Sequence, residues 1–121
     1  MRSLSKILVV PAFAVCALVA SALMSHGGRA EAACHPETFH DEQAEGGVCC
    51  FPEHSHTGTS MNQESRAGAI SVAVQGWEDF VWFEYGSDYD HWSLAHSKST
   101  ECTNGSGGWS CTVHARPCHR D

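Results

Sequence analysis

Cysteine content constrains this chain more than any other feature, because its 121 residues include 7 cysteines. One of them, Cys16, lies in an apolar N-terminal run, and the other six lie downstream of it. An even number of cysteines in a short exported chain predicts a disulfide framework, here of three bridges. Cys102 and Cys111 flank a glycine-rich turn, and we predict that they pair with each other. The other two bridges are then shared by Cys34, Cys49, Cys50 and Cys118.

The N-terminal segment has the three zones of a secretory signal peptide. Arg2 and Lys6 precede an uncharged run over residues 7–24, and Ala30-Glu31-Ala32 supplies small residues for cleavage. We predict export of an unfolded chain, cleavage near Ala32, and a mature protein that is periplasmic or secreted. An uncleaved membrane anchor is the alternative, because the run is close to the minimum length that crosses a bilayer. After cleavage, no stable membrane span is expected.

The predicted mature part of the chain, residues 33–121, is strongly acidic. It contains 13 Asp and Glu residues against 4 Lys and Arg residues, a formal charge of −9. Nucleic acid is excluded as a partner, because binding it depends on clustered Lys and Arg that neutralise phosphates. A protein partner is instead expected to present a basic surface, which the acidic chain attracts.

Polar residues dominate residues 33–67, which are rich in His, Glu, Ser and Gly. This stretch has neither helical nor strand periodicity, so we predict an arm that its cysteines tether to the rest of the chain. Residues 68–121 are predicted to form a small domain. It begins with an antiparallel β-hairpin, in which an alternating strand over 70–75 and an aromatic strand over 80–85 flank a turn at 76–79.

The next segment is predicted to be a helix. Ser87 and Asp90 resemble a helix start, and apolar residues at helical spacing continue to Cys102. The alternative is a strand, since Trp92, Leu94 and His96 would then share one face.

The C-terminal part of the predicted domain contains a loop and a strand. Residues 104–108 are a glycine-rich loop, and residues 109–116 alternate as a strand that ends at Pro117. The predicted fold class is therefore α+β: a small disulfide-stapled domain with an antiparallel β-hairpin, one helix and a C-terminal strand.

This order of elements opens with Gly68-Ala69-Ile70, has Cys102 at the end of the helix, and places Cys111 and Cys118 on and after the last strand. In these features, residues 68–118 resemble a bacterial family of small exported, disulfide-bonded domains of unknown function. The resemblance implies a disulfide-bonded α+β fold and assigns no catalytic residue.

Histidine is unusually frequent, with 9 residues in the whole chain. The four histidines of the polar arm are candidate ligands for Zn²⁺ or Cu²⁺, because imidazole suits such borderline metals. They are His35, His40, His54 and His56, and Glu53 adds a carboxylate beside them. None of the spacings matches an established zinc motif, so a solvated arm without metal is the alternative.

Acid–base chemistry is the third candidate activity. Glu84, Asp88, Asp90 and His91 gather where the second predicted strand meets the predicted helix, and a His–carboxylate pair suits proton transfer. Helix capping accounts for the same residues without a substrate. Since the chain also lacks a G-x-S-x-G nucleophile elbow, we assign no catalytic residue.

The aromatic residues exceed what one face of three short strands buries. We predict that Trp77 lies on the surface in the hairpin turn, where Glu78 and Asp79 add negative charge, and that these three residues form a partner surface. The alternative is that the arm folds over the hairpin and buries it. The sequence therefore favours a binding module, with metal binding through the arm and a small hydrolase as the alternatives.

Overall fold

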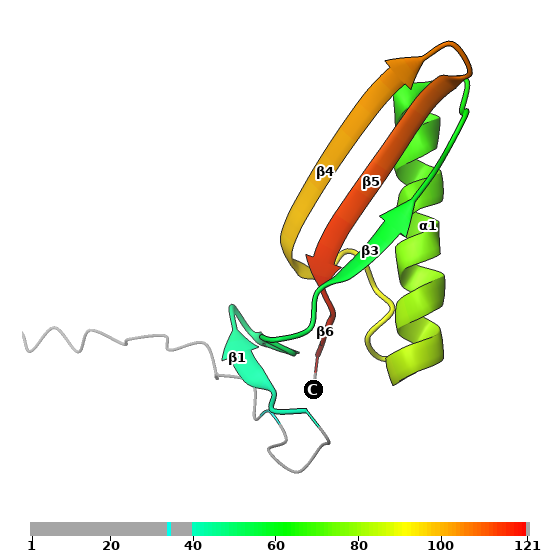
Figure 1. Cartoon of the computed structure of the whole chain (residues 1–121). Helices are drawn as coiled ribbons and strands as arrows, with labels where there is room; N and C mark the ends of the chain where they lie inside the picture. Colours follow the sequence, from blue (N-terminus) through cyan, green and yellow to red (C-terminus); the bar gives the residue numbers. More distant parts are fainter. Residues whose placement is uncertain (1–33, 35–39, 121) are drawn as a thin grey trace, which may run out of the picture.

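The computed structural model describes Cys34 and residues 40–120, which form one helix and two antiparallel sheets of three strands each. The elements, in chain order, are β1 (Gln43–Glu45), β2 (Val48–Cys50), β3 (His56–Thr59), α1 (Arg66–Tyr85), β4 (His96–Gly105), β5 (Gly108–Arg116) and β6 (Cys118–His119). The larger sheet has the order β3–β5–β4, and α1 lies along one of its faces (Figure 1). The smaller sheet, β1–β2–β6, lies near the C-terminal end of α1 (Figure 1). The mixed α+β class is confirmed.

The hairpin predicted over residues 70–85 is wrong, because this segment is the helix α1. Ser65 caps its N-terminus, with the hydroxyl accepting a hydrogen bond of 3.0 Å from the Gly68 amide. Its C-terminus lies at Gly86, which has a positive φ of 93°. The buried residues recur every four positions and therefore form one helical stripe: Ala69, Ala73, Trp77 and Val81.

The main core lies between this stripe and the larger sheet. The prediction that Trp77 is a surface residue is wrong, because its side chain is fully buried and its indole Nε1 donates to the Ala115 carbonyl at 3.2 Å. The helix comes very close to β3 at Gly58, where a Cβ atom would lie 1.9 Å from the Ala73 carbonyl oxygen. Small residues at Gly58 and Ala73 thus allow α1 to pack directly against β3.

The helix predicted from Ser87 to Cys102 is also wrong. Of the three residues that defined the alternative strand, Trp92 and Leu94 lie in turns, and only His96 lies in a strand, β4. Turns lead from the end of α1 to β4, which pairs with β5 as an antiparallel hairpin. The predicted loop over 104–108 is shorter than expected, because Gly105 pairs with Gly108 across a two-residue turn. The C-terminal strand predicted over 109–116 is confirmed as β5.

The disulfide framework agrees with the prediction. Cys102 and Cys111 lie opposite each other in the β4–β5 hairpin and are bonded. The other four cysteines form the two remaining bridges, Cys34–Cys49 and Cys50–Cys118. The Cys50–Cys118 bridge joins β2 to β6 and so fastens the predicted arm to the end of the chain. The arm also contributes β3 to the larger sheet.

Some predictions concern residues outside those described: the signal segment with cleavage near Ala32, and His35. Among the described residues, no helix has the length and apolar character needed to cross a membrane.

A charged contact connects the two sheets. The Glu45 carboxylate on β1 lies 2.6 Å from Arg116 Nη2 on β5 and 3.1 Å from His96 Nδ1 on β4. Burial alone would raise the pKa of Glu45, but the hydrogen bonds from Arg116 and His96 outweigh it and lower the pKa below its ordinary value of 4.5. The ionised carboxylate therefore stabilises the folded state.

We expect Glu45→Gln to lower the free energy of unfolding at neutral pH by an amount on the order of 1 kcal/mol. Because folding lowers the pKa of Glu45, its contribution is complete above pH 4.5 and is lost as the pH falls through the folded-state value. Urea unfolding at a series of pH values measures how the free energy of unfolding depends on Glu45. The wild type is expected to lose more stability in acid than Glu45→Gln does, while the exposed control Glu101→Gln follows the wild type. Parallel curves for wild type and Glu45→Gln would contradict the assignment.

Candidate functional site

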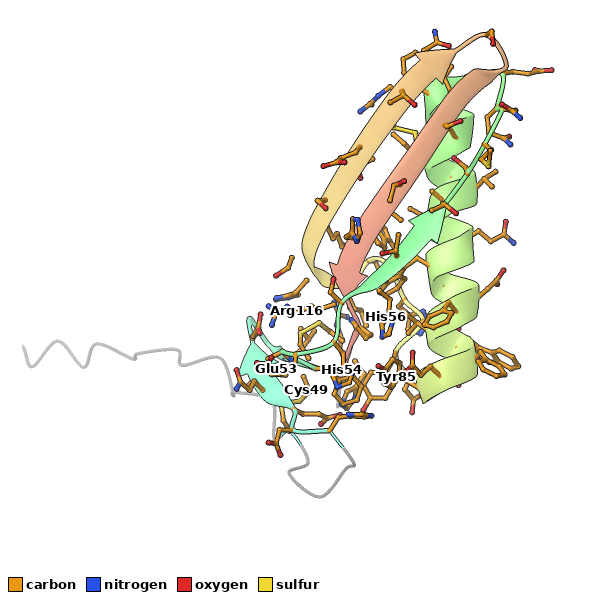
Figure 2. The ribbon with its side chains drawn as sticks, viewed as in Figure 1. Cys49, Glu53, His54, His56, Tyr85 and Arg116 are labelled. Atoms are coloured by element: carbon orange, nitrogen blue, oxygen red, sulfur yellow. A yellow bond between two sulfur atoms is a disulfide. The ribbon has the colours of Figure 1, made fainter. Side chains whose placement is uncertain are left out.

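Side chains from the predicted arm and the end of α1 meet around the hydroxyl of Tyr85 (Figure 2). His56 Nε2 lies 2.8 Å from this oxygen, and His54 Nδ1 lies 3.1 Å from it. His56 Nε2 is also 3.4 Å from a carboxylate oxygen of Glu84. The histidine ring of His40 packs against that of His54, with ring centroids 4.1 Å apart. We refer to His40, His54, His56, Glu84 and Tyr85 as the histidine cluster.

The fold assembles this cluster from three parts of the chain. His40 and His54 flank β1 and β2, His56 begins β3, and the last turn of α1 carries Glu84 and Tyr85. An aromatic layer supports the cluster, since the Phe51 ring lies 4.9 Å from that of Tyr85 and 4.8 Å from that of Tyr89. The structure thus brings together three of the four predicted metal-ligating histidines.

The surroundings favour the uncharged forms of two members of the cluster, His56 and Tyr85. Burial lowers the pKa of His56, although the nearby Glu84 carboxylate opposes this shift. Burial and the charge of Glu84 raise the pKa of Tyr85 to about 12. A phenol both donates and accepts hydrogen bonds, so its single oxygen can contact both imidazoles at once. The hydroxyl of Tyr85 therefore bridges His54 and His56.

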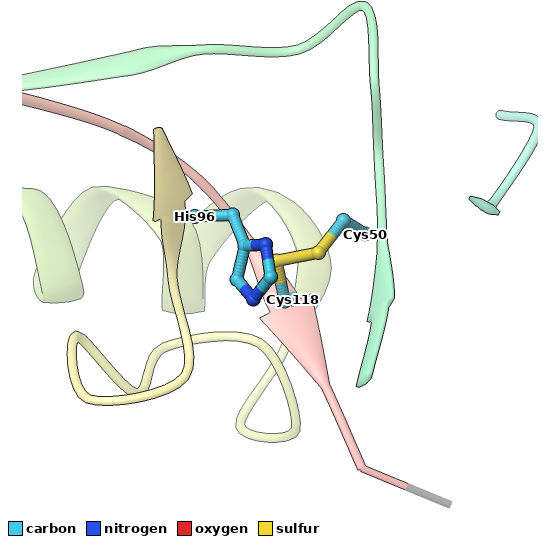
Figure 3. Close-up of side chains that lie close together, drawn as sticks. All are labelled: Cys50, His96 and Cys118. Carbon is cyan, nitrogen blue, oxygen red and sulfur yellow. A yellow bond between two sulfur atoms is a disulfide. The ribbon is translucent and has the colours of Figure 1, made fainter. Parts of the chain in front are cut away.

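Two other groups of potential metal ligands lie beside disulfides. Among the described residues, the sets of three His, Cys, Asp or Glu whose ligand atoms all lie within 4.8 Å of one another are Cys50–His96–Cys118 (Figure 3) and Cys34–Glu42–Cys49. Both cysteine pairs are oxidised, and the thiolate rather than the disulfide is the metal ligand. Neither group therefore binds a metal in this disulfide-bonded state.

The predicted partner surface is altered by the fold. Trp77 is core, and Glu78 accepts a hydrogen bond of 3.1 Å from the Trp92 amide, whereas Asp79 is exposed. The same segment nevertheless exposes three large aromatic side chains on α1: Phe80 is 47% exposed, Trp82 57% and Phe83 82%. We call these three residues the aromatic surface. Helical spacing from Trp77 and Val81 would have placed them outside the buried stripe.

The predicted acid–base group is divided between different surroundings. Glu84 faces His56 in the histidine cluster. His91 Nδ1 lies 3.5 Å from Asp90 Oδ1, in the turns that follow α1. The predicted capping role is also wrong, because no helix begins at Ser87.

Comparisons of the chain with models of protein families, with curated proteins and with solved structures found no match. The resemblance inferred for residues 68–118 therefore stays a prediction. Functional inference depends on the geometry of the histidine cluster and of the aromatic surface.

Proposed function

We propose that the protein is an exported binding module whose aromatic surface docks onto a basic, partly apolar protein surface. The observation that supports this is the exposure of Phe80, Trp82 and Phe83 in the last two turns of one helix. Exposed clusters of large apolar side chains are typical of interaction sites, and aromatic residues contribute strongly to binding at such sites.

The aromatic surface is carried on a rigid support. The opposite side of α1 is packed against the larger sheet through Trp77 and Val81. Aromatic side chains have only two rotatable angles, so little conformational entropy is lost when they are buried by a partner. A fixed helix that presents them therefore lowers the cost of binding.

Charge favours a basic partner. Asp79 and Glu84 are exposed on the same two turns of α1, and the whole chain has a formal charge of −7. A second copy of this chain, an anionic membrane or a nucleic acid would be repelled by this charge. A surface that combines apolar residues with Lys or Arg complements it.

Export is the second part of the proposal. Three disulfides in so short a chain are typical of proteins in oxidising compartments. The N-terminal segment with small residues near Ala32 would direct the chain there.

We expect the double variant Trp82→Ala/Phe83→Ala to lose partner binding at least about tenfold, since hot-spot residues each contribute more than about 1 kcal/mol. The probe is an amphipathic peptide of Leu and Lys, compared with its Leu and Glu counterpart, and fluorescence anisotropy measures both affinities. The wild type is expected to bind the Lys peptide, more weakly as salt increases.

The matched control is Met61→Ala, which removes an exposed apolar side chain outside the aromatic surface. It is expected to bind the Lys peptide as the wild type does. Equal affinity of the double variant, or a preference for the Glu peptide, would contradict the proposal. Thermal unfolding checks that the double variant remains folded, as expected for two exposed positions.

A further inference from the structure

The strand β3 lies at one edge of the larger sheet, and within the described part of the chain no strand pairs with its outer side. The Ser60 amide donates to the Cys111 carbonyl at 2.8 Å, in the same register as the β3–β5 ladder. Because hydrogen-bonded positions alternate along an antiparallel pair, the backbone N–H and C=O groups of Thr57 and Thr59 point away from β5. Such an edge is a template for another extended segment.

A stripe of α1 borders this edge, in the half of the helix that continues past β3 on the side opposite β5 (Figure 1). A Cβ atom on Gly76 would lie 3.8 Å from the Thr59 carbonyl oxygen. One turn further on, the Phe80 ring lies 5.0 Å from that of His56, and the Glu84 carboxylate follows at 3.4 Å from His56 Nε2. Phe80 is nevertheless 47% exposed, and the side chain of Glu84 is 39% exposed. We call this stripe and the free edge of β3 the edge site.

The spacing of the stripe matches that of a strand. Four helical residues rise about 6 Å, and alternate residues of a strand lie about 6.7 Å apart. A segment added beside β3 would therefore place every second side chain over Gly76, Phe80 and Glu84 in turn. Gly76 leaves space for a large apolar side chain, whereas the Glu84 carboxylate attracts a cationic one.

We propose that an extended segment of a partner protein docks at the edge site as a fourth, antiparallel strand of the larger sheet. Gly76 lies beside the end of β3 and Glu84 beside its start, so α1 and the docked strand run in the same direction. The segment therefore has a large apolar residue first and Lys or Arg four residues later. This inference rests on the proposed function, because Phe80 belongs to the aromatic surface, and it adds the conformation and sequence pattern of the partner.

The probe is the capped peptide Ile-Thr-Val-Thr-Lys-Thr, and fluorescence anisotropy measures its affinity for the intact, oxidised protein. Docked as proposed, its Ile, Val and Lys side chains face α1, and the N–H groups of its Thr residues face β3. N-methylation of these Thr amides is expected to lower the affinity at least about fivefold, because hydrogen bonds to β3 are lost. The matched control is methylation of the Val and Lys amides, which point away from β3 and leave the affinity within about twofold.

Thr59→Pro tests the same contact from the side of the protein. It removes an outward N–H, a change that edge strands tolerate, and is expected to weaken binding at least about fivefold. The control is Thr100→Pro on the free edge of β4. Gly105 pairs with Gly108 across the hairpin turn, so alternation directs the Thr100 amide away from β5 as well, and binding is unaltered.

Two further variants test the stripe on α1. Gly76→Leu fills the space that the first apolar side chain would occupy, so binding is expected to weaken at least about tenfold. Glu84→Gln is expected to abolish the preference for this peptide over its counterpart with Glu in place of Lys.

Equal affinity of the two methylated peptides, wild-type binding in Thr59→Pro, or no binding by the wild type would overturn the proposal. If Thr59→Pro does not fold, the methylated peptides still decide, because they are tested on the wild type. Sedimentation is expected to show a monomer, and a dimer that Thr59→Pro separates would assign the edge to a second copy instead. Binding of the Leu and Lys peptide without binding of this one would reject the edge site and leave the proposed function standing.

Discussion

Trp77→Ala is expected to destabilise the protein by about 3–5 kcal/mol, the usual cost of removing a buried Trp. Its indole is fully buried between α1 and the larger sheet, packs edge-on against Trp92, and donates to the Ala115 carbonyl. Truncation leaves a cavity and an unsatisfied buried acceptor. A domain of this size has a net stability of about 5–15 kcal/mol, so a large part of it would be lost. Urea unfolding followed by circular dichroism measures the change.

The control for this experiment is Trp82→Ala on the same helix. Trp82 is exposed, so the expected change in the free energy of unfolding is within about 0.5 kcal/mol. If Trp77→Ala proved as stable as Trp82→Ala, that result would contradict the burial of Trp77 between α1 and the sheet. Trp77→Phe, which retains most of the ring but not the indole N–H, is expected to fall between the two.

The error in predicting Trp77 shows where local pattern and fold diverge. Residues 70–75 alternate apolar and polar side chains, which is typical of a strand, and residues 80–85 are rich in aromatic and β-branched residues. The stripe that actually faces the sheet begins with Ala69 and Ala73, whose small side chains give a weak helical signal. Their small size is needed because Gly58 of β3 approaches the helix there. A short stretch of sequence around Ala73 does not include Gly58, so its pattern cannot reveal this contact.

Strand pairing with a distant part of the chain also determines the secondary structure of the segment after α1. Ser87 and Asp90 have the composition of a helix start, but the chain from His96 onward pairs with β5 over most of its length. Its Thr residues suit a strand, and the Cys102–Cys111 bridge fastens it to β5. This bridge was predictable because both cysteines flank a short glycine-rich turn.

The histidine cluster was predictable in part. His54 and His56 are two residues apart and close to Glu53, so their proximity could be inferred from the sequence. Their actual neighbours, Glu84 and Tyr85, lie about thirty positions further along the chain. With residues 80–85 placed in a strand, no pattern connected them to the arm. The helix brings them together, because its last turn ends beside β3 and the smaller sheet (Figure 1).

Reduction of all three disulfides is expected to unfold the protein, because the core is small and the bridges contribute roughly 2–4 kcal/mol each. The three contributions differ with the length of chain that each bridge closes. Cys50–Cys118 spans 68 positions, whereas Cys102–Cys111 spans 9. Loop-closure entropy then predicts about 4.4 kcal/mol for the long bridge and about 2.6 kcal/mol for the short one.

The paired variants Cys50→Ala/Cys118→Ala and Cys102→Ala/Cys111→Ala test this order without exposing free thiols. We expect the first pair to lower the free energy of unfolding more than the second, because the long bridge closes 68 positions of the chain and the short bridge only 9. Urea unfolding of both variants measures the difference. A fully reduced wild type that kept a cooperative thermal transition would show instead that contacts between α1 and the larger sheet stabilise the fold without the bridges.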